Sequence, residues 1–131
     1  QSERALDLLD RAMGMGGPSR DLIMERAMRR FRIGRTEAAI EDFEALARRD
    51  PHFLPAHFNL GVTLGAAGHY HEAAASFGRV LEIDPDHARA LFHLALAQRA
   101  AGLTGMARSQ CERLGRLDPG LAVELRSFLG F

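Results

Sequence analysis

A spacing of 34 residues recurs along this 131-residue chain and limits what the chain can fold into. Pro51, Pro85 and Pro119 lie 34 residues apart, and each follows an aspartate. The same spacing relates five further sets of positions: Gly34, Gly68 and Gly102; Ala39, Ala73 and Ala107; Phe43, Phe77 and Cys111; Leu46, Val80 and Leu114; Ala27, Gly61 and Ala95. Because a fixed period of about 20–50 residues is typical of stacked repeats, the sequence predicts three copies of one structural unit.

Each unit has the pattern of two helices. Apolar residues in 70–82 recur at every third or fourth position, which is the spacing of one helix face. Glycine follows the first helical run of each unit and proline follows the second, and both residues stop helices. The predicted helices span 20–33, 36–48, 54–67, 70–82, 88–101 and 104–116. The expected fold class is therefore all-α, with antiparallel helices in each unit.

The segments on either side of the three units follow the same pattern. Residues 1–17 are predicted to hold the second helix of a truncated repeat, over 2–13, and a glycine-rich linker. Residues 120–131 are predicted to form a helix that caps the apolar face of the last unit. Because the chain begins Gln-Ser-Glu, without an initiator methionine, we expect a mature form or a fragment of a longer protein.

These residues resemble the tetratricopeptide repeat (TPR) family, whose pattern is W-x2-L-G-x2-Y, then A-x3-F, then P. The middle unit carries the matching residues His57, Leu60, Gly61, Leu64, Ala73, Phe77 and Pro85. The first unit departs from the pattern at Arg26, where the family has leucine. The resemblance implies an α-solenoid, a right-handed superhelix of antiparallel helix pairs. We expect a single TPR domain over residues 1–131, with repeats at 20–53, 54–87 and 88–119.

The composition favours a soluble globular protein. Hydrophobic residues make up 47% of the chain, and no apolar run is long enough to span a bilayer. The lack of such a run predicts no membrane insertion, and because seventeen acidic residues balance seventeen basic ones, we expect no nucleic-acid partner. Every basic residue is arginine, which indicates a GC-rich, bacterial genome. Both cytoplasm and periplasm are open to bacterial proteins of this type.

Groups able to carry catalysis or bind metal are few. His69 and His71 lie in a predicted turn without an acid or a cysteine at ligand spacing, so we interpret them as polar turn residues. Cys111 shares a predicted core position with Phe77, and a thiol buried among apolar groups is inert. A nucleophilic Cys111 with His93 as its base is therefore not expected. We predict no enzyme activity, no cofactor and no metal.

Charged residues on predicted helix surfaces are interpreted as solvated groups. Glu41 and Asp42 are assigned to such a surface, and His87 to an exposed connection between repeats. A basic cluster comprises Arg26, Arg29, Arg30, Arg32 and Arg35. We interpret this cluster as a solvent-exposed face with salt bridges to Glu25, Glu37 and Glu41. A surface for phosphate or RNA is the alternative interpretation.

The resemblance places a binding surface on the inner, concave side of the stack, which the first helix of each repeat lines. The corresponding positions are Met24, Met28, Phe31, Phe58, Asn59, Val62, Arg89, Phe92, His93 and Leu96. The predicted function is a non-catalytic protein–protein interaction module or scaffold that holds a peptide segment of a partner in this groove. The alternative for the apolar positions is packing between repeats alone.

The carboxylate clamp of chaperone-binding TPR domains is present only in part. That clamp consists of two lysines, two asparagines and an arginine. Asn59 matches a clamp asparagine and Arg89 stands at a clamp lysine position, whereas Met24, Met28 and His93 replace the other three residues. A high-affinity clamp of that type is therefore not expected.

Two other functions remain open. One is a self-assembling oligomeric scaffold, in which the uncovered face of residues 2–13 pairs with another copy. The other is the non-catalytic TPR arm of a larger enzyme.

Overall fold

The computed structural model of the chain describes Arg4 and residues 19–131. The predicted helix over 2–13, apart from Arg4, and the predicted linker lie outside the described residues. Seven helices and no strand are found in the described part, namely α2 (Arg20–Arg32), α3 (Thr36–Arg49), α4 (Leu54–Ala66), α5 (Tyr70–Ile83), α6 (Ala88–Ala100), α7 (Thr104–Leu117) and α8 (Pro119–Leu129). The six helices of the three repeats, α2 to α7, begin and end within one residue of their predicted bounds, and α8 ends two residues before the predicted residue 131. The prediction of an all-α fold is confirmed.

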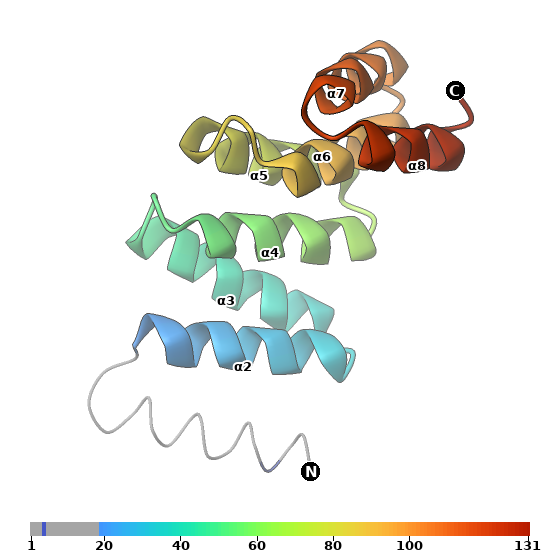
Figure 1. Cartoon of the computed structure of the whole chain (residues 1–131). Helices are drawn as coiled ribbons and strands as arrows, with labels where there is room; N and C mark the ends of the chain where they lie inside the picture. The colour runs from blue at the N-terminus through green and yellow to red at the C-terminus, as the bar shows by residue number, and fades with distance from the viewer. Residues whose placement is uncertain (1–3, 5–18) are drawn as a thin grey trace.

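The helices form three successive antiparallel pairs, α2 with α3, α4 with α5 and α6 with α7, stacked in one direction (Figure 1). Each described helix packs mainly on the helix before it and the helix after it in the chain. The last helix, α8, packs on both α6 and α7. This is the layered arrangement of an α-solenoid.

Local signals set the helix ends. Gly34, Gly68 and Gly102 follow the first helix of each pair with φ angles of +87°, +84° and +84°, a backbone conformation that favours glycine. At the other end of the last pair, the Asp118 side chain accepts a hydrogen bond from the Leu121 amide, at 3.0 Å. This N-cap and a proline at the first helical position start α8 at Pro119.

The repeated small and large residues form the core. Ala39, Ala73 and Ala107 are fully buried, so the helices approach closely at these positions. Phe43 and Phe77 are 1% and 2% exposed and fill the space between layers. Buried apolar residues fall into separate clusters, of which the largest extends from α2 to α6 and another from α6 to α8. The assignment of these positions to the core is confirmed.

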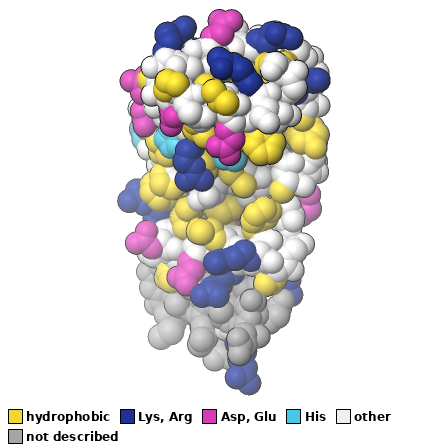
Figure 2. Space-filling model, turned by 45° about the vertical axis from the view of Figure 1, so that its right-hand side comes forward, with side chains coloured by type: hydrophobic (Ala, Val, Ile, Leu, Met, Phe, Trp, Pro, Cys, Tyr) yellow, Lys and Arg dark blue, Asp and Glu magenta, His cyan; other side chains and the backbone are white. Residues whose placement is uncertain are grey.

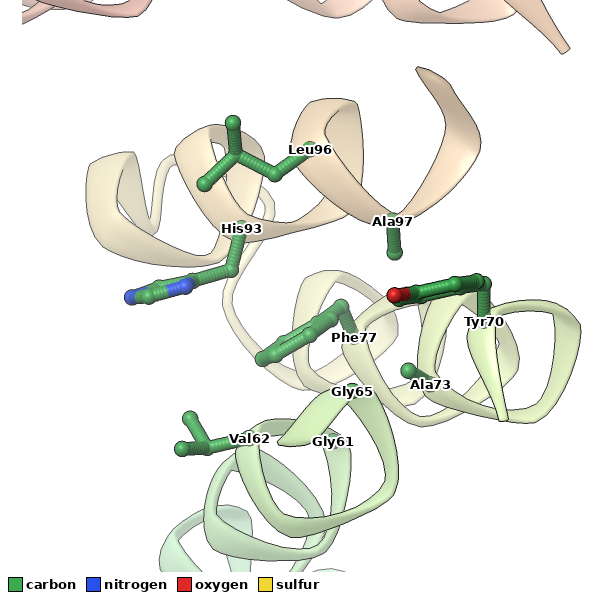
Figure 3. A pocket seen from close by; sticks show the side chains of 9 residues that line it. All are labelled: Gly61, Val62, Gly65, Tyr70, Ala73, Phe77, His93, Leu96 and Ala97. Atoms are coloured by element: carbon green, nitrogen blue, oxygen red, sulfur yellow. The ribbon is translucent and has the colours of Figure 1, made fainter. Parts of the chain in front are cut away.

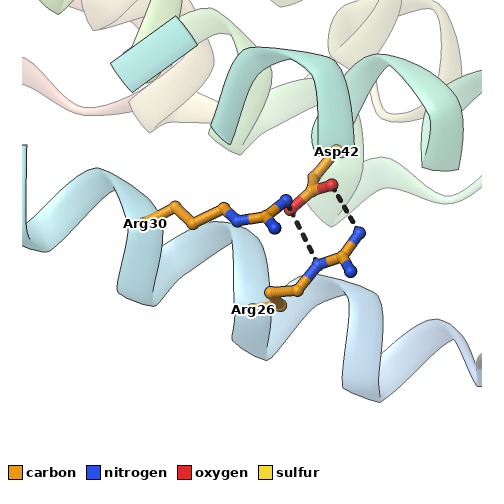
Figure 4. A network of polar contacts seen from close by, with 3 residues as sticks. All are labelled: Arg26, Arg30 and Asp42. Carbon is orange, nitrogen blue, oxygen red and sulfur yellow. Dashed lines mark hydrogen bonds and ion pairs between the residues drawn. The ribbon is translucent and has the colours of Figure 1, made fainter. Parts of the chain in front are cut away.

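Asp42 corrects the interpretation of the charged surface (Figure 4). Its side chain is buried, although it was assigned to a solvated face. Nε and Nη2 of Arg26 donate hydrogen bonds to the carboxylate at 3.2 and 2.8 Å, and Nη1 of Arg30 donates one at 2.7 Å. The two arginines thus turn inward from α2 onto α3, since a buried carboxylate requires paired donors. Elsewhere in the basic cluster, Arg29 pairs at 3.4 Å with Glu25, one of the three acids to which salt bridges were predicted.

Candidate binding groove

Two pockets lie side by side along the first helices of the pairs. The first, which we call the α4–α6 pocket, has a volume of about 210 Å³. Its lining residues are Gly61, Val62, Gly65, Tyr70, Ala73, Phe77, His93, Leu96 and Ala97. The second, the α2–α4 pocket, has a volume of about 240 Å³. Its lining residues are Met28, Phe31, Arg32, Phe43, Asn59, Val62 and Thr63. Because Val62 lines both, the two pockets are neighbours along one surface.

The α4–α6 pocket is mainly apolar, with a few polar groups (Figure 3). Val62 from α4 and Leu96 from α6 contribute aliphatic walls, and the Phe77 ring lies between them and Tyr70. The Tyr70 hydroxyl is directed toward Phe77. The pocket therefore offers an apolar interior with one hydroxyl and one imidazole, that of His93, at its sides.

His93 lies at the centre of an aromatic cluster. Its ring stacks on Phe77 at a centroid distance of 5.4 Å, and it meets Phe58 and Phe92 edge to face at 5.5 and 5.7 Å. Burial lowers the pKa of His93, and the positive charge of Arg89 and the neighbouring His87 lower it further. His93 is consequently a neutral imidazole at neutral pH.

Arg89 and Phe128 extend this cluster at its edges. The Arg89 guanidinium lies 5.3 Å from the centre of the Phe58 ring, within the range of a cation–π contact. Phe128 of α8 meets Phe92 at 6.0 Å. His87 was expected to be exposed, but it is half-buried, because its Nδ1 accepts a hydrogen bond from the Ala90 amide at 3.0 Å and its ring lies beside Phe58.

The structure brings most of the predicted groove residues to this surface. Val62, His93 and Leu96 line the α4–α6 pocket, and Met28, Phe31, Asn59 and Val62 line the α2–α4 pocket. Phe58, Arg89 and Phe92 line neither pocket and belong to the aromatic cluster beside them. Met24 packs against the core and lines neither pocket.

Several lining residues were not predicted from the sequence, among them Gly65 and Tyr70. The 34-residue register contains a signal for Gly65, because its counterparts in the other repeats are Phe31 and Arg99. A glycine at a position where the other two repeats have large side chains indicates that side-chain volume is missing there. Gly61, Ala73 and Phe77 were assigned to the fold alone, yet they also form part of the pocket wall.

In the described part of the chain, the other candidate sites show no arrangement suited to metal binding or catalysis. His69 and His71 are exposed, and His69 Nε2 lies 3.7 Å from a Glu37 carboxylate oxygen. The described residues contain no group of three or more His, Cys, Asp or Glu arranged to hold a metal ion. Burial raises the pKa of the Cys111 thiol. Among the described helices, none combines the length and the apolar character needed to cross a membrane.

Apolar side chains gather across the middle layers of one face of the molecule (Figure 2). Arginine, acidic and histidine side chains border this area. Such a contiguous apolar area with a polar border is typical of a surface that meets another molecule.

The tetratricopeptide repeat is the family that matches this chain, over residues 24–64 and 58–122. The chain therefore belongs to the TPR family, whose fold is in general a scaffold for protein–protein interaction. The predicted family and the predicted TPR-type solenoid are confirmed.

One curated relative is the small glutamine-rich tetratricopeptide repeat-containing protein 2 of Mycosarcoma maydis, which is 29% identical over 83 residues. The match covers 63% of this chain and 24% of that protein, so the chain spans about a quarter of its relative's length.

Solved structures share the fold. The chain superposes on the MamA protein with a TM-score of 0.82 at 19% identity, covering 90% of this chain and 64% of MamA. It also superposes on YrrB, a TPR protein with an unusual peptide-binding site, with a TM-score of 0.85 at 20% identity. That match covers 96% of this chain and 66% of YrrB.

Proposed function

We propose that the protein is a non-catalytic interaction module that holds a peptide segment of a partner protein along the two neighbouring pockets. The observation that carries this proposal is the pair of apolar pockets that share Val62 on the first helices of the repeats. Two pockets in a row suit a segment that presents successive apolar side chains. The peptide-binding site of YrrB, which has the same fold, supports the use of this architecture for peptides.

The polar groups beside the pockets orient a peptide in the groove. Asn59 lines the α2–α4 pocket and offers both a donor and an acceptor to a peptide backbone. Arg89 carries a guanidinium that is exposed beyond the Phe58 ring, where it forms charge-assisted hydrogen bonds with a carboxylate or a carbonyl oxygen.

The experiment is a selection of random peptides displayed against the full chain, followed by affinity measurements on the recovered peptides. The Asn59→Ala/Arg89→Ala variant tests the groove, and His71→Ala/Arg116→Ala is the matched control with two exposed polar residues on second helices. We expect the groove variant to bind at least about tenfold more weakly and the control to bind within about twofold of wild type. Equal binding of every peptide by the groove variant would contradict the proposal.

A further inference from the structure

The α4–α6 pocket exists because one position in the repeat lacks a side chain. Gly65 of α4 stands where the neighbouring repeats have Phe31 in α2 and Arg99 in α6. In the neighbouring α2–α4 pocket, the Phe31 ring is itself part of the wall. The middle repeat alone leaves this position open, and the opening is the α4–α6 pocket.

The space at Gly65 is free of close neighbours. A Cβ atom built on Gly65 has only the Cβ of Ala73 within 4 Å, at 4.0 Å, which is ordinary van der Waals contact. One turn earlier, by contrast, a Cβ atom on Gly61 would lie 2.7 Å from the Phe77 ring. Gly61 is therefore required for packing inside the protein, whereas the packing around Gly65 does not require a glycine.

The size and lining of the pocket define what fits. A closed apolar cavity of about 150 Å³ holds a benzene molecule, and the α4–α6 pocket has about 210 Å³. One phenylalanine or leucine side chain therefore fits. The walls from Val62, Phe77 and Leu96 contact such a side chain with carbon atoms, and the neutral His93 adds no charge to the interior.

The charges around the pocket indicate what lies next to that side chain. Arg32 and Arg99 occupy the last turns of α2 and α6, on either side of Gly65 in the stack. Within the described part of the chain, the ion pairs involve neither of these arginines. The residues that line the two pockets include Arg32 and no carboxylate. An acidic residue beside the apolar one can therefore pair with Arg32, which lines the adjoining α2–α4 pocket, or with Arg99 in the last turn of α6.

We propose that the α4–α6 pocket is an anchor site for one large apolar side chain, phenylalanine or leucine, of an acidic partner segment, and that Gly65 determines this specificity. The inference rests on the proposed function, since it describes how the same groove selects its peptide. Because Gly65 has no side chain, the pocket is deep enough to hold the anchor side chain.

The test is the substitution Gly65→Leu, which fills the pocket with a side chain of the protein itself. Leucine at position 65 occupies the space that the anchor needs, and helix interiors favour it over glycine. Gly78→Leu is the matched control, because Gly78 is also a helix glycine and a Cβ atom there has nothing within 4 Å. The probe is a short synthetic peptide of glycine, serine and glutamate with one central phenylalanine, titrated by heteronuclear NMR. Versions with central alanine, or with arginine in place of glutamate, test the anchor and the charge.

We expect the phenylalanine peptide to shift the amide signals of Val62, Tyr70 and Leu96 in wild type and in Gly78→Leu. Gly65→Leu should bind at least about tenfold more weakly, with a thermal midpoint equal to or above that of wild type. Should Gly65→Leu not fold, Gly65→Ala adds one methyl group and is expected to bind about threefold more weakly. The alanine and arginine peptides should bind wild type more weakly than the parent peptide does.

The outcomes separate the two proposals. Unchanged affinity of folded Gly65→Leu for the phenylalanine peptide would overturn the anchor site. If displayed peptides still depend on Asn59 and Arg89 in that case, the groove function stands without the anchor. If the pocket signals respond to protein concentration and not to the peptide, the occupant is a second copy of this chain and the anchor proposal fails.

Discussion

The Phe77 ring lies against Gly61 so closely that a Cβ atom on Gly61 would stand 2.7 Å from it. Real Cβ atoms do not approach an aromatic carbon to that distance, so the ring or the helix would have to move. Phe77 is 2% exposed and belongs to the core cluster of α2–α6, so a shift of its ring would disturb that packing. The contact between α4 and α5 therefore depends on glycine at position 61.

The three glycines at positions 61, 65 and 78 should respond differently to alanine. We expect Gly61→Ala to lower the free energy of unfolding by about 1–3 kcal/mol through overpacking. Gly65→Ala and Gly78→Ala should raise it by about 0.5–1 kcal/mol each, because both sites are helical and neither added methyl group clashes. Urea denaturation of the three variants checks this order, and a stable Gly61→Ala would contradict the packing described.

Removal of the buried carboxylate at position 42 should destabilise the first repeat. Asp42→Asn keeps the size of the side chain but removes the carboxylate charge that Arg26 and Arg30 contact. We expect a loss of about 1–3 kcal/mol, below the range of about 3–5 kcal/mol for fully buried pairs, because both arginines remain partly exposed.

Glu41→Gln is the control for this change. Glu41 is exposed and adjacent in sequence, so its variant should stay within about 0.5 kcal/mol of wild type. Equal unfolding midpoints for the two variants would show that the buried arrangement contributes nothing.

Acid should weaken the fold partly through His93. Its pKa is lowered by burial in the native state, so the unfolded chain binds this proton more readily than the folded chain. The associated stability is fully present above the unfolded-state pKa of about 6.5 and is lost as the pH falls through the lower folded-state pKa. His93→Phe keeps an aromatic ring on Phe77 and cannot be protonated.

We therefore expect the urea midpoint of wild type to fall more between about pH 7.5 and about pH 5 than that of His93→Phe. His71→Gln, a change at an exposed histidine outside the aromatic cluster, is the control over the same range. Identical pH dependence of wild type and His93→Phe would contradict the assignment.

The thiol of Cys111 should react slowly while the protein is folded. The side chain is 3% exposed, and burial raises its pKa, so both access and thiolate content are low. We expect modification by a thiol reagent to be roughly a hundredfold slower than in denaturant, since the reagent needs a local opening. Native and unfolded rates of similar size would place Cys111 at an accessible site.

The six helices of the three repeats could be predicted from the sequence to within one residue because their stop signals are local. Gly68 and the Asp84-Pro85 pair act on the backbone of their immediate neighbours, whatever the tertiary structure. The burial of Asp42 could not be predicted from such local signals. Its burial depends on two arginines that reach it from another helix, 16 and 12 residues away in sequence.

The site was predicted less completely than the fold. Side chains such as Val62 and Leu96 could be assigned to the groove from their place in the repeat. Gly65 could not, because a pocket is a property of the space that several helices leave between them. The sequence signal for this pocket is the contrast between Gly65 and its counterparts Phe31 and Arg99. That contrast gives neither the shape nor the depth of the opening.

The division of the core into separate clusters has a kinetic consequence. Phe77 and Ala97, which line the α4–α6 pocket, belong to the cluster of α2–α6, whereas Leu125 and Leu129 of α8 belong to that of α6–α8. Contacts between helices that are neighbours in the chain require only short loops to close, so we expect folding to be fast and to start in any layer. Fraying of α8 would interrupt its own cluster first. Phe77 and Ala97 therefore keep their core contacts when α8 alone opens, whereas Leu96, which packs against the α6–α8 cluster, loses part of its support.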